Sequence, residues 1–189
     1  MSTIETRLRN GVDIGRLAAT IRAVEADPTL AEFQFRAHNT WIDGGHNRST
    51  IKGFFGAGQE DESRTGVFVY DNDEPDVLLG QDNGANPVEY VLHALAGCLT
   101  TSLVYHAAAR GIRIDRVESW YEGDLDLRGF LGVSDDVRRG YQAVRVRFAI
   151  DAPGATRDQL EELVQMGMKH SPVFDTVSNP VGVSVSLAD

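Results

Sequence analysis

The sequence predicts an α+β fold in which helices pack on a mostly antiparallel sheet. Two observations predict this class: several segments alternate apolar and polar residues with period two, and residues 87–110 form one long, largely apolar segment of helical character. The expected order is helix, three strands, helix, two strands, helix, strand. A chain of 189 residues can bury the core of one domain. We divide it into an N-terminal helical extension over residues 1–30 and a main domain over residues 31–189.

The first expected helix covers residues 13–27, with Asp13 as its N-cap and Pro28 as its stop. Its apolar side recurs at helical spacing and consists of Ile14, Leu17, Ile21 and Val24. We expect this short amphipathic helix to dock onto the main body, and the alternative is a loosely held arm.

Three strands are expected next, at residues 32–41, 46–55 and 65–71. The polar, glycine-containing segment 56–64 between the last two is expected to be a loop. Residues 74–87 form a long irregular connection, a kind of segment that is often functional or mobile.

The central helix is expected over residues 87–110, because proline suits its first position and glycine follows its last turn. Strands follow at 112–127 and 141–150. Thr156 and Gln159 form a capping box for a helix over 157–169. A final strand is expected over residues 180–187, where valines alternate with small residues.

The composition excludes several function classes. The chain has 18 basic and 28 acidic residues, a formal net charge of −10, which argues against nucleic acid or an anionic membrane as the main partner. We expect no membrane span, and the N-terminus lacks the apolar core of a signal peptide, so a cytoplasmic location is expected. CxxC, HExxH, P-loop and GxGxxG motifs are absent from the sequence, and no metal or cofactor is expected.

Cys98, in the middle of the central helix, is the only cysteine of the chain. One cysteine cannot form an intramolecular disulfide, which fits a reducing compartment. On an ideal helix Cys98 shares a face with Val91, Leu95, Ser102 and Tyr105, whereas Glu89 lies on the opposite side. The helix therefore supplies no base to its own thiol, and any activating group must come from another element or another subunit. The alternative is that Cys98 is inert core filling, just as His93 and His106 are expected to be hydrogen-bonded core or interface residues.

The pattern NPxEyxLhALAGC, a helix ending in AxxxGI, and a later HSPVxDTV followed by a PVxV strand resembles the OsmC/Ohr family, the osmotically inducible and organic hydroperoxide resistance proteins. The resemblance covers about residues 32–187. It implies an intertwined homodimer in which sheets wrap around two central helices and the active site lies at the subunit interface. It further implies a peroxidatic cysteine on the central helix, a resolving cysteine in a CPV motif, reduction by dithiols, and an Arg and a Glu that stabilise the thiolate.

Carried over by position, Cys98 matches the peroxidatic cysteine, whereas Ser171 stands where the family has its resolving cysteine. The family's Glu directly follows the proline, but here Glu89 comes one residue later. The family's Arg follows a GG turn, and here that turn is followed by His46, with Arg48 as the nearest arginine. Since serine cannot form a disulfide, the two-cysteine cycle is closed to this chain.

Two functions remain. The first is a one-cysteine peroxidase in which the Cys98 thiolate attacks a small organic hydroperoxide, Arg48 or His46 stabilises the thiolate, and an external thiol reductant resolves the sulfenic acid. The second is a non-catalytic protein that binds a hydrophobic or acyl-type small molecule at the dimer interface, with Cys98 as pocket lining. A stress-associated protein without turnover is a third, less specific possibility. Because the central helix is apolar almost all round, a homodimer is expected in each case.

Overall fold

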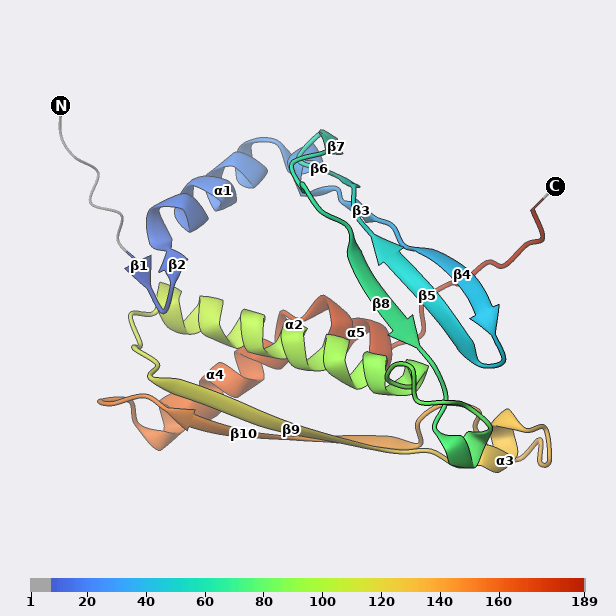
Figure 1. The fold of residues 1–189 in the computed structure, drawn as a ribbon. Coiled ribbons are helices and arrows are strands. Elements are labelled where there is room, and N and C mark those ends of the chain that lie inside the picture. Colours follow the sequence, from blue (N-terminus) through green and yellow to red (C-terminus); the bar gives the residue numbers. More distant parts are fainter. Residues whose placement is uncertain (1–7, 189) are drawn as a thin grey trace. The chain divides into compact units, whose positions relative to one another are not determined.

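The computed structural model describes residues 8–188 and divides them into two compact units. The first consists of residues 13–91, and the second of residues 8–12 together with residues 92–188. Figure 1 labels their helices and strands. The predicted α+β class is confirmed, with antiparallel sheets and one long central helix.

The first unit begins with helix α1, Ile14–Ala26. Asp13 caps it by accepting a hydrogen bond from the Arg16 backbone N–H, and a 3-10 turn, η1 (Pro28–Ala31), follows, so both predicted ends are confirmed. None of its residues is buried, and Ile21 is 51% exposed. The expected docking of this helix is therefore not seen within the described chain.

Two three-stranded antiparallel sheets follow in the first unit. One has the order β4-β5-β8 (His38–Asp43, His46–Ile51 and Phe68–Asn72), and the other the order β3-β6-β7 (Gln34–Phe35, Phe54–Gly56 and Gln59–Asp61). Each of the first two predicted strands is thus divided in two. The two breaks lie opposite each other in the hairpin, between Phe35 and His38 on the first strand and between Ile51 and Phe54 on the second. Both strands of the hairpin therefore pass from one sheet into the other at the same point.

The predicted loop at 56–64 contains strand β7, which is a correction. Ala57 and Gly58 both have positive φ, 50° and 79°, as a tight two-residue hairpin turn requires. The chain therefore turns back and pairs β7 with β6. Polarity alone did not reveal this short strand because both of its faces are largely exposed.

The connection after β8 is organised by Asp73, which is buried at 2% exposure. Its carboxylate accepts hydrogen bonds from the backbone N–H groups of Glu74, Gln81 and Asn83 and from the Asn83 side chain. The segment contains only a short 3-10 turn, η2 (Asp76–Leu78). One carboxylate thus ties together both ends of an otherwise irregular loop.

Helix α2, Pro87–Ala109, confirms the predicted central helix to within one residue. Asn86 accepts a hydrogen bond from the Val88 N–H at its start, and Gly111, at φ 74°, follows its last turn. One stripe of the helix is buried and consists of Leu95, Leu99, Leu103, Ala107 and Ala108. By length and composition α2 could also cross a membrane, but core helices of globular proteins pass the same test.

The second unit packs helix α4 and a two-stranded hairpin around α2. Strands β9 (Arg116–Asp124) and β10 (Ala143–Asp151) pair antiparallel, and α4 (Arg157–Lys169) begins with the predicted capping box. The core consists of Leu103, Ala107 and Leu163, with partly buried neighbours that include Phe148 and Ile150. A short helix, α3 (Leu127–Phe130), follows β9 and was not predicted.

The C-terminal segment differs from the prediction. Helix α5, Pro172–Ser178, occupies most of the HSPVFDT segment, and residues 180–188 form no strand within the described chain. The alternating residues of the expected strand are strongly exposed, with Val183 at 80%, Val185 at 93% and Leu187 at 97%. A strand needs a neighbouring edge with which to pair, and this segment finds none in the described part of its own chain.

Residues 8–13 form a small hairpin, β1 (Leu8–Arg9) and β2 (Val12–Asp13), of which residues 8–12 belong to the second unit. At its tip the Asn10 side chain donates a hydrogen bond to the Ile112 carbonyl and accepts one from the Ile114 N–H, at 2.9 and 3.0 Å. The hairpin is thereby fastened to the connection between α2 and β9.

Candidate functional site

Cys98 lines a cavity of about 490 Å³ within the second unit. The cavity runs along one face of α2 and against the residues between α4 and α5, and its lining includes Cys98, Ser102, Tyr105, His106, His170 and Pro172. Ser102 and Tyr105 are two of the four residues predicted to share the face of Cys98, and the other two, Val91 and Leu95, do not line the cavity. The thiol is partly accessible, so it lies in a hollow that a small molecule can enter.

Two histidines meet in this cavity. The ring centroids of His106, on α2, and His170, the C-cap of α4, are 4.6 Å apart. Burial, the neighbouring His170 and the positive charge of Arg110 together hold the pKa of His106 below its ordinary value. His106 is therefore mainly neutral at neutral pH. His170 could not be identified from the sequence as a cavity residue, because nothing local indicates that its ring lies against a residue of another helix.

Ser171 lies between two residues that line the cavity, His170 and Pro172, but does not itself line it. It is 2% exposed and is the N-cap of α5, where its hydroxyl accepts a hydrogen bond from the Phe174 N–H at 3.1 Å. The position where a resolving cysteine was expected thus has a structural role in this chain, that of beginning a helix.

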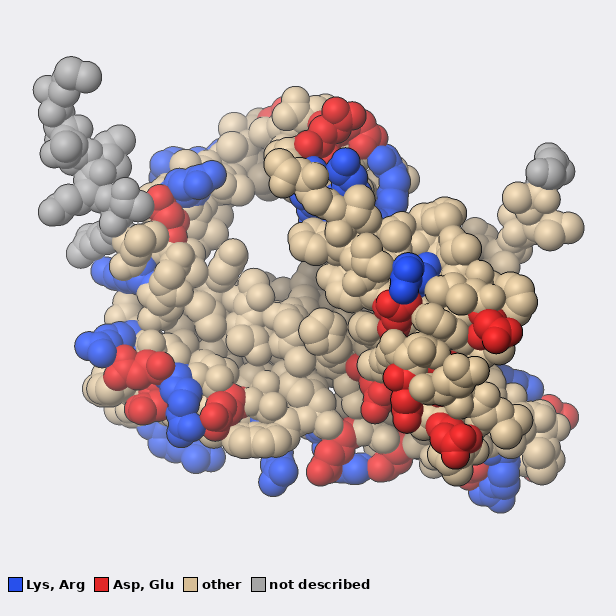
Figure 2. Space-filling model, viewed as in Figure 1, with Lys and Arg blue, Asp and Glu red and all other residues tan. Residues whose placement is uncertain are grey.

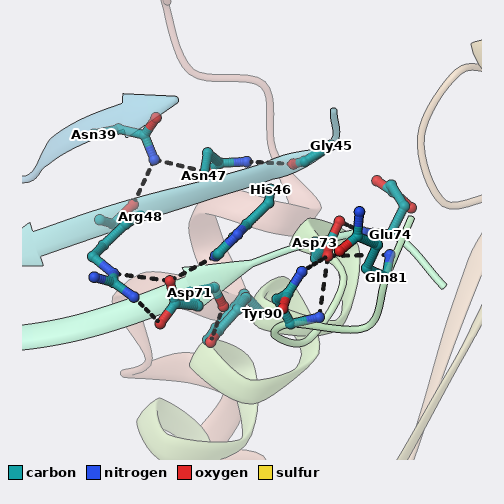
Figure 3. A network of polar contacts seen from close by, with 12 residues as sticks. Asn39, Gly45, His46, Asn47, Arg48, Asp71, Asp73, Glu74, Gln81 and Tyr90 are labelled. Carbon is teal, nitrogen blue, oxygen red and sulfur yellow. Dashed lines mark hydrogen bonds and ion pairs between the residues drawn. The ribbon is translucent and has the colours of Figure 1, made fainter. Parts of the chain in front are cut away.

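The two predicted cationic residues, Arg48 and His46, meet on Asp71 in the first unit (Figure 3). Arg48 donates two hydrogen bonds, from Nε to Oδ1 at 2.9 Å and from a terminal nitrogen to Oδ2 at 3.0 Å. His46 Nε2 lies 2.9 Å from the same Oδ1. The bonds from Arg48 first, and then from His46, hold the pKa of Asp71 below its usual range, and Asp71 raises that of Arg48.

Asp71 was not identified from the sequence. Strand β5 pairs antiparallel with β8, and Arg48 stands directly opposite Asp71 in the register. Opposite charges at directly paired positions could have been found from the sequence only if the register of the two strands had been known. The backbone carbonyl of Asp71 also accepts a hydrogen bond from the Tyr90 hydroxyl, which joins this cluster to the first turn of α2.

Glu89 is the remaining predicted site residue. Its carboxylate accepts a hydrogen bond from the Asn86 backbone N–H at 2.9 Å, as a residue in the first turn of a helix does when it caps the N-terminus. The structure therefore groups Arg48 and His46 with Asp71, places Glu89 at the helix start, and places Cys98 in a cavity that His106 and His170 also line. Arg48 belongs to the first unit and Cys98 to the second, and the pairing of Arg48 with Cys98 remains a prediction.

No three His, Cys, Asp or Glu side chains among residues 8–188 are grouped so as to hold a metal ion. On the face shown in Figure 2, basic and acidic residues are interspersed, without an extended basic patch. The chemistry that this site offers is that of a thiol, two imidazoles and a phenol in a hollow of small-molecule size.

The fold and the site define a class: an α+β protein that carries one half-buried thiol on a long central helix. The sequence model of the OsmC-like protein family matches residues 80–186, more than half of the chain, so the chain belongs to the OsmC-like family. It is a member with a single cysteine. No curated protein matches it in sequence.

Solved structures of OsmC-like proteins share the fold. The chain is similar to an OsmC-like protein from Mycoplasma pneumoniae, with 16% identity and a TM-score of 0.59, over 78% of this chain and 89% of that one. An OsmC-like protein of unknown function from Vibrio cholerae gives 14% identity and 0.54, over 76% and 92%. An organic hydroperoxide resistance protein, OsmC, from Legionella pneumophila gives 15% and 0.50, over 76% and 89%. At such identities the likeness establishes the fold alone, and the family is one that includes hydroperoxide resistance proteins.

Proposed function

We propose that the protein is a one-cysteine, thiol-dependent peroxidase that reduces organic hydroperoxides, with Cys98 as the nucleophile. The observation that carries the proposal is the position of the single thiol: it is half-buried, on the central helix of an OsmC-like chain, and opens into a cavity of about 490 Å³. A cavity of this size accommodates a small organic molecule.

The reaction proceeds in two stages. The Cys98 thiolate attacks the terminal oxygen of the hydroperoxide, the O–O bond breaks, and the alkoxide takes up a proton and leaves as an alcohol. Sulfur loses two electrons and becomes a sulfenic acid. Because the chain has no second cysteine, an external thiol attacks the sulfenic sulfur and releases water, and a second external thiol frees Cys98 and leaves as a disulfide.

Arg48 is our first choice for the cation that stabilises the thiolate, and His46 is the second. Their hydrogen bonds to Asp71 support this assignment, because a bidentate carboxylate holds a guanidinium in one orientation. Glu89, whose carboxylate caps the backbone of α2, supports the site indirectly by fixing the start of the helix that carries Cys98.

We further propose a homodimer, in the cytoplasm. Within the described chain α2 buries only one stripe, while Val91 and Tyr105 on its other faces are 38% and 48% exposed. The exposed valines of residues 180–188 have the pattern of a strand that lacks a neighbour. Both features call for a second copy. Light scattering should give the mass of a dimer at micromolar concentration, and a stable folded monomer would contradict this assembly.

A specific observation favours the second candidate, a non-catalytic protein that binds a hydrophobic or acyl-type molecule with Cys98 as pocket lining. Ser171 stands where a resolving cysteine was expected, and its hydroxyl caps the start of α5. A chain that has lost the resolving residue could retain the cavity for binding alone.

Intact-mass spectrometry after treatment with a small excess of tert-butyl hydroperoxide distinguishes the two candidates. A peroxidase should gain one oxygen on Cys98, trappable with dimedone, and proceed to sulfinic acid when no external thiol is added. Cys98→Ser should abolish both products, because the chain contains no other thiol.

Ser171→Cys provides a second readout. If position 171 faces Cys98, the new thiol should close a disulfide with it on oxidation, provided that the two Cα atoms lie about 4.4–6.8 Å apart. If wild-type Cys98 stays a free thiol at hydroperoxide concentrations that oxidise a reference thiol peroxidase, the enzyme assignment is wrong and the binding assignment replaces it.

A further inference from the structure

The cavity beside Cys98 is longer than a peroxide group requires. Cys98 and His106 both line it and are eight residues apart on α2, which corresponds to about 12 Å along the helix axis. His106 is therefore too far from the thiol to exchange a proton with it directly. The histidine pair and the thiol therefore lie at separate ends of the cavity.

The distant end of the cavity is lined by imidazole side chains and has no carboxylate among its described lining residues. His106 and His170 bring two imidazoles within 4.6 Å of each other, and Arg110 lies close enough to His106 to lower its pKa further. Among the described residues that line the cavity there is no Asp or Glu, although the chain has 28 acidic residues and a net charge of −10. A neutral imidazole still offers one N–H donor, and a protonated one offers two.

We propose that this cavity binds an elongated amphipathic anion whose carboxylate or phosphate head is held by His106 and His170, while its body lies along Ser102 and Tyr105 toward Cys98. The proposal rests on the proposed function only in placing a hydroperoxide group at the Cys98 end. The anion site itself stands on the cavity and on the histidine pair, and it makes these two residues specificity determinants.

The proposed anion site should bind its ligand with an affinity that depends on pH. Burial, His170 and Arg110 disfavour the charged form of His106 in the free protein, and Glu162 partly offsets Arg110 by pairing with it at 2.8 Å. A bound anion favours the charged form, so binding takes up a proton and affinity rises as the pH falls from 8 to 6. Cys98 and Tyr105 also line the cavity, but a thiol and a phenol cannot become cations by taking up a proton in this way.

The test uses the reduced full-length protein and non-oxidising probes: octanoate, its methyl ester and octyl phosphate, measured by calorimetry in a phosphate-free buffer. Octanoate or octyl phosphate should bind at least about tenfold more tightly than the ester, since a hydrogen bond to a charged group is worth about one power of ten or more. His106→Gln and His170→Gln should each remove about tenfold of that affinity. His38→Gln, at an exposed position on β4, is the matched control and should change nothing.

The tighter of the two anionic probes identifies the head group. Equal binding of octanoate, octyl phosphate and ester, or no effect of either cavity histidine in variants with native circular dichroism, would overturn the proposal. His106→Asn and His170→Asn provide a second set should a glutamine variant fail to fold. If octanoate binding depends on the histidines but Cys98 resists tert-butyl hydroperoxide, the anion site is supported and the peroxidase is refuted. If Cys98 is oxidised but octanoate binding does not depend on the histidines, the peroxidase is supported and the anion site is refuted.

Discussion

Asp73→Asn tests what organises the connection between β8 and α2. The carboxylate accepts four hydrogen bonds: Oδ1 from the Glu74 N–H at 2.8 Å, and Oδ2 from the Gln81 N–H, the Asn83 N–H and the Asn83 side chain at 3.2, 3.1 and 2.7 Å. An amide has only one oxygen, so either orientation turns an NH₂ group toward at least one of these donors. We expect the melting temperature to fall by roughly 4–10 °C at pH 7.

The Asp73 carboxylate also makes the stability of the protein depend on pH. Burial alone would raise the pKa of Asp73, but the hydrogen bonds from Asn83, Glu74 and Gln81 outweigh it and lower the pKa from 3.8 to about 2. A lowered folded-state pKa means that the contribution is fully present above about pH 4 and is lost as the pH falls toward 2. The wild type should therefore lose melting temperature more steeply than Asp73→Asn between pH 5 and pH 2.

Thermal unfolding followed by circular dichroism, at one fixed protein concentration, measures both effects. Asp135→Asn is the matched control, because the Asp135 side chain is 97% exposed, and its melting temperature should equal that of the wild type at every pH. If Asp73→Asn has the same melting temperature as the wild type at pH 7, the buried carboxylate does not hold this loop. The same conclusion follows if the difference between the two melting temperatures does not become smaller as the pH falls.

Three further changes test the core, an orphaned hydroxyl and the cation cluster. Leu163→Ala, at a fully buried position, should lower the free energy of unfolding by about 2–5 kcal/mol in urea, whereas Leu79→Ala, at 94% exposure, should have almost no effect; equal losses would contradict the assigned core. The Tyr121 hydroxyl is buried without a hydrogen-bond partner among the described residues, so Tyr121→Phe should leave the melting temperature unchanged or raise it, and a clear fall would reveal a partner in the assembled protein. Arg48→Met should slow alkylation of Cys98 by iodoacetamide at pH 7, while Arg139→Met, at an exposed residue, should not; an unchanged rate would remove Arg48 from the site.

The helices could be predicted from the sequence because the signals that define them are local. Asp13 and Thr156 cap α1 and α4 as expected, and Gly111 follows the last turn of α2. Helical geometry also placed Cys98 on the same face as Ser102 and Tyr105, which line its cavity. Capping and periodicity depend on neighbours within a few residues, so one chain suffices to recognise them.

The strands and the rest of the site depend on partners distant in the sequence. The hairpin that includes β4 and β5 divides between two sheets at positions that no local signal marks. Residues 180–188 have the alternation of a strand but lack an edge to pair with in the described chain. Asp71 joins Arg48 only through the β5–β8 register, and His170 reaches His106 only because α4 returns to α2. Each of these contacts is decided by tertiary pairing.

The hydrogen bonds of the Asn10 side chain to Ile112 and Ile114 bear on how the chain connects its two units. Residues 8–12 belong to the second unit, α1 and the sheets belong to the first, and α2 leads back to the second, so the polypeptide crosses between the units twice. A protease cut in the η1 turn falls inside the first unit and leaves both crossings intact, the one between residues 12 and 13 and the one inside α2. Residues 8–12 are thus joined to the rest of the second unit by hydrogen bonds and not by a continuous stretch of chain. A truncated protein that begins at α1 would leave the Ile112 carbonyl and the Ile114 N–H without the side chain that serves them both.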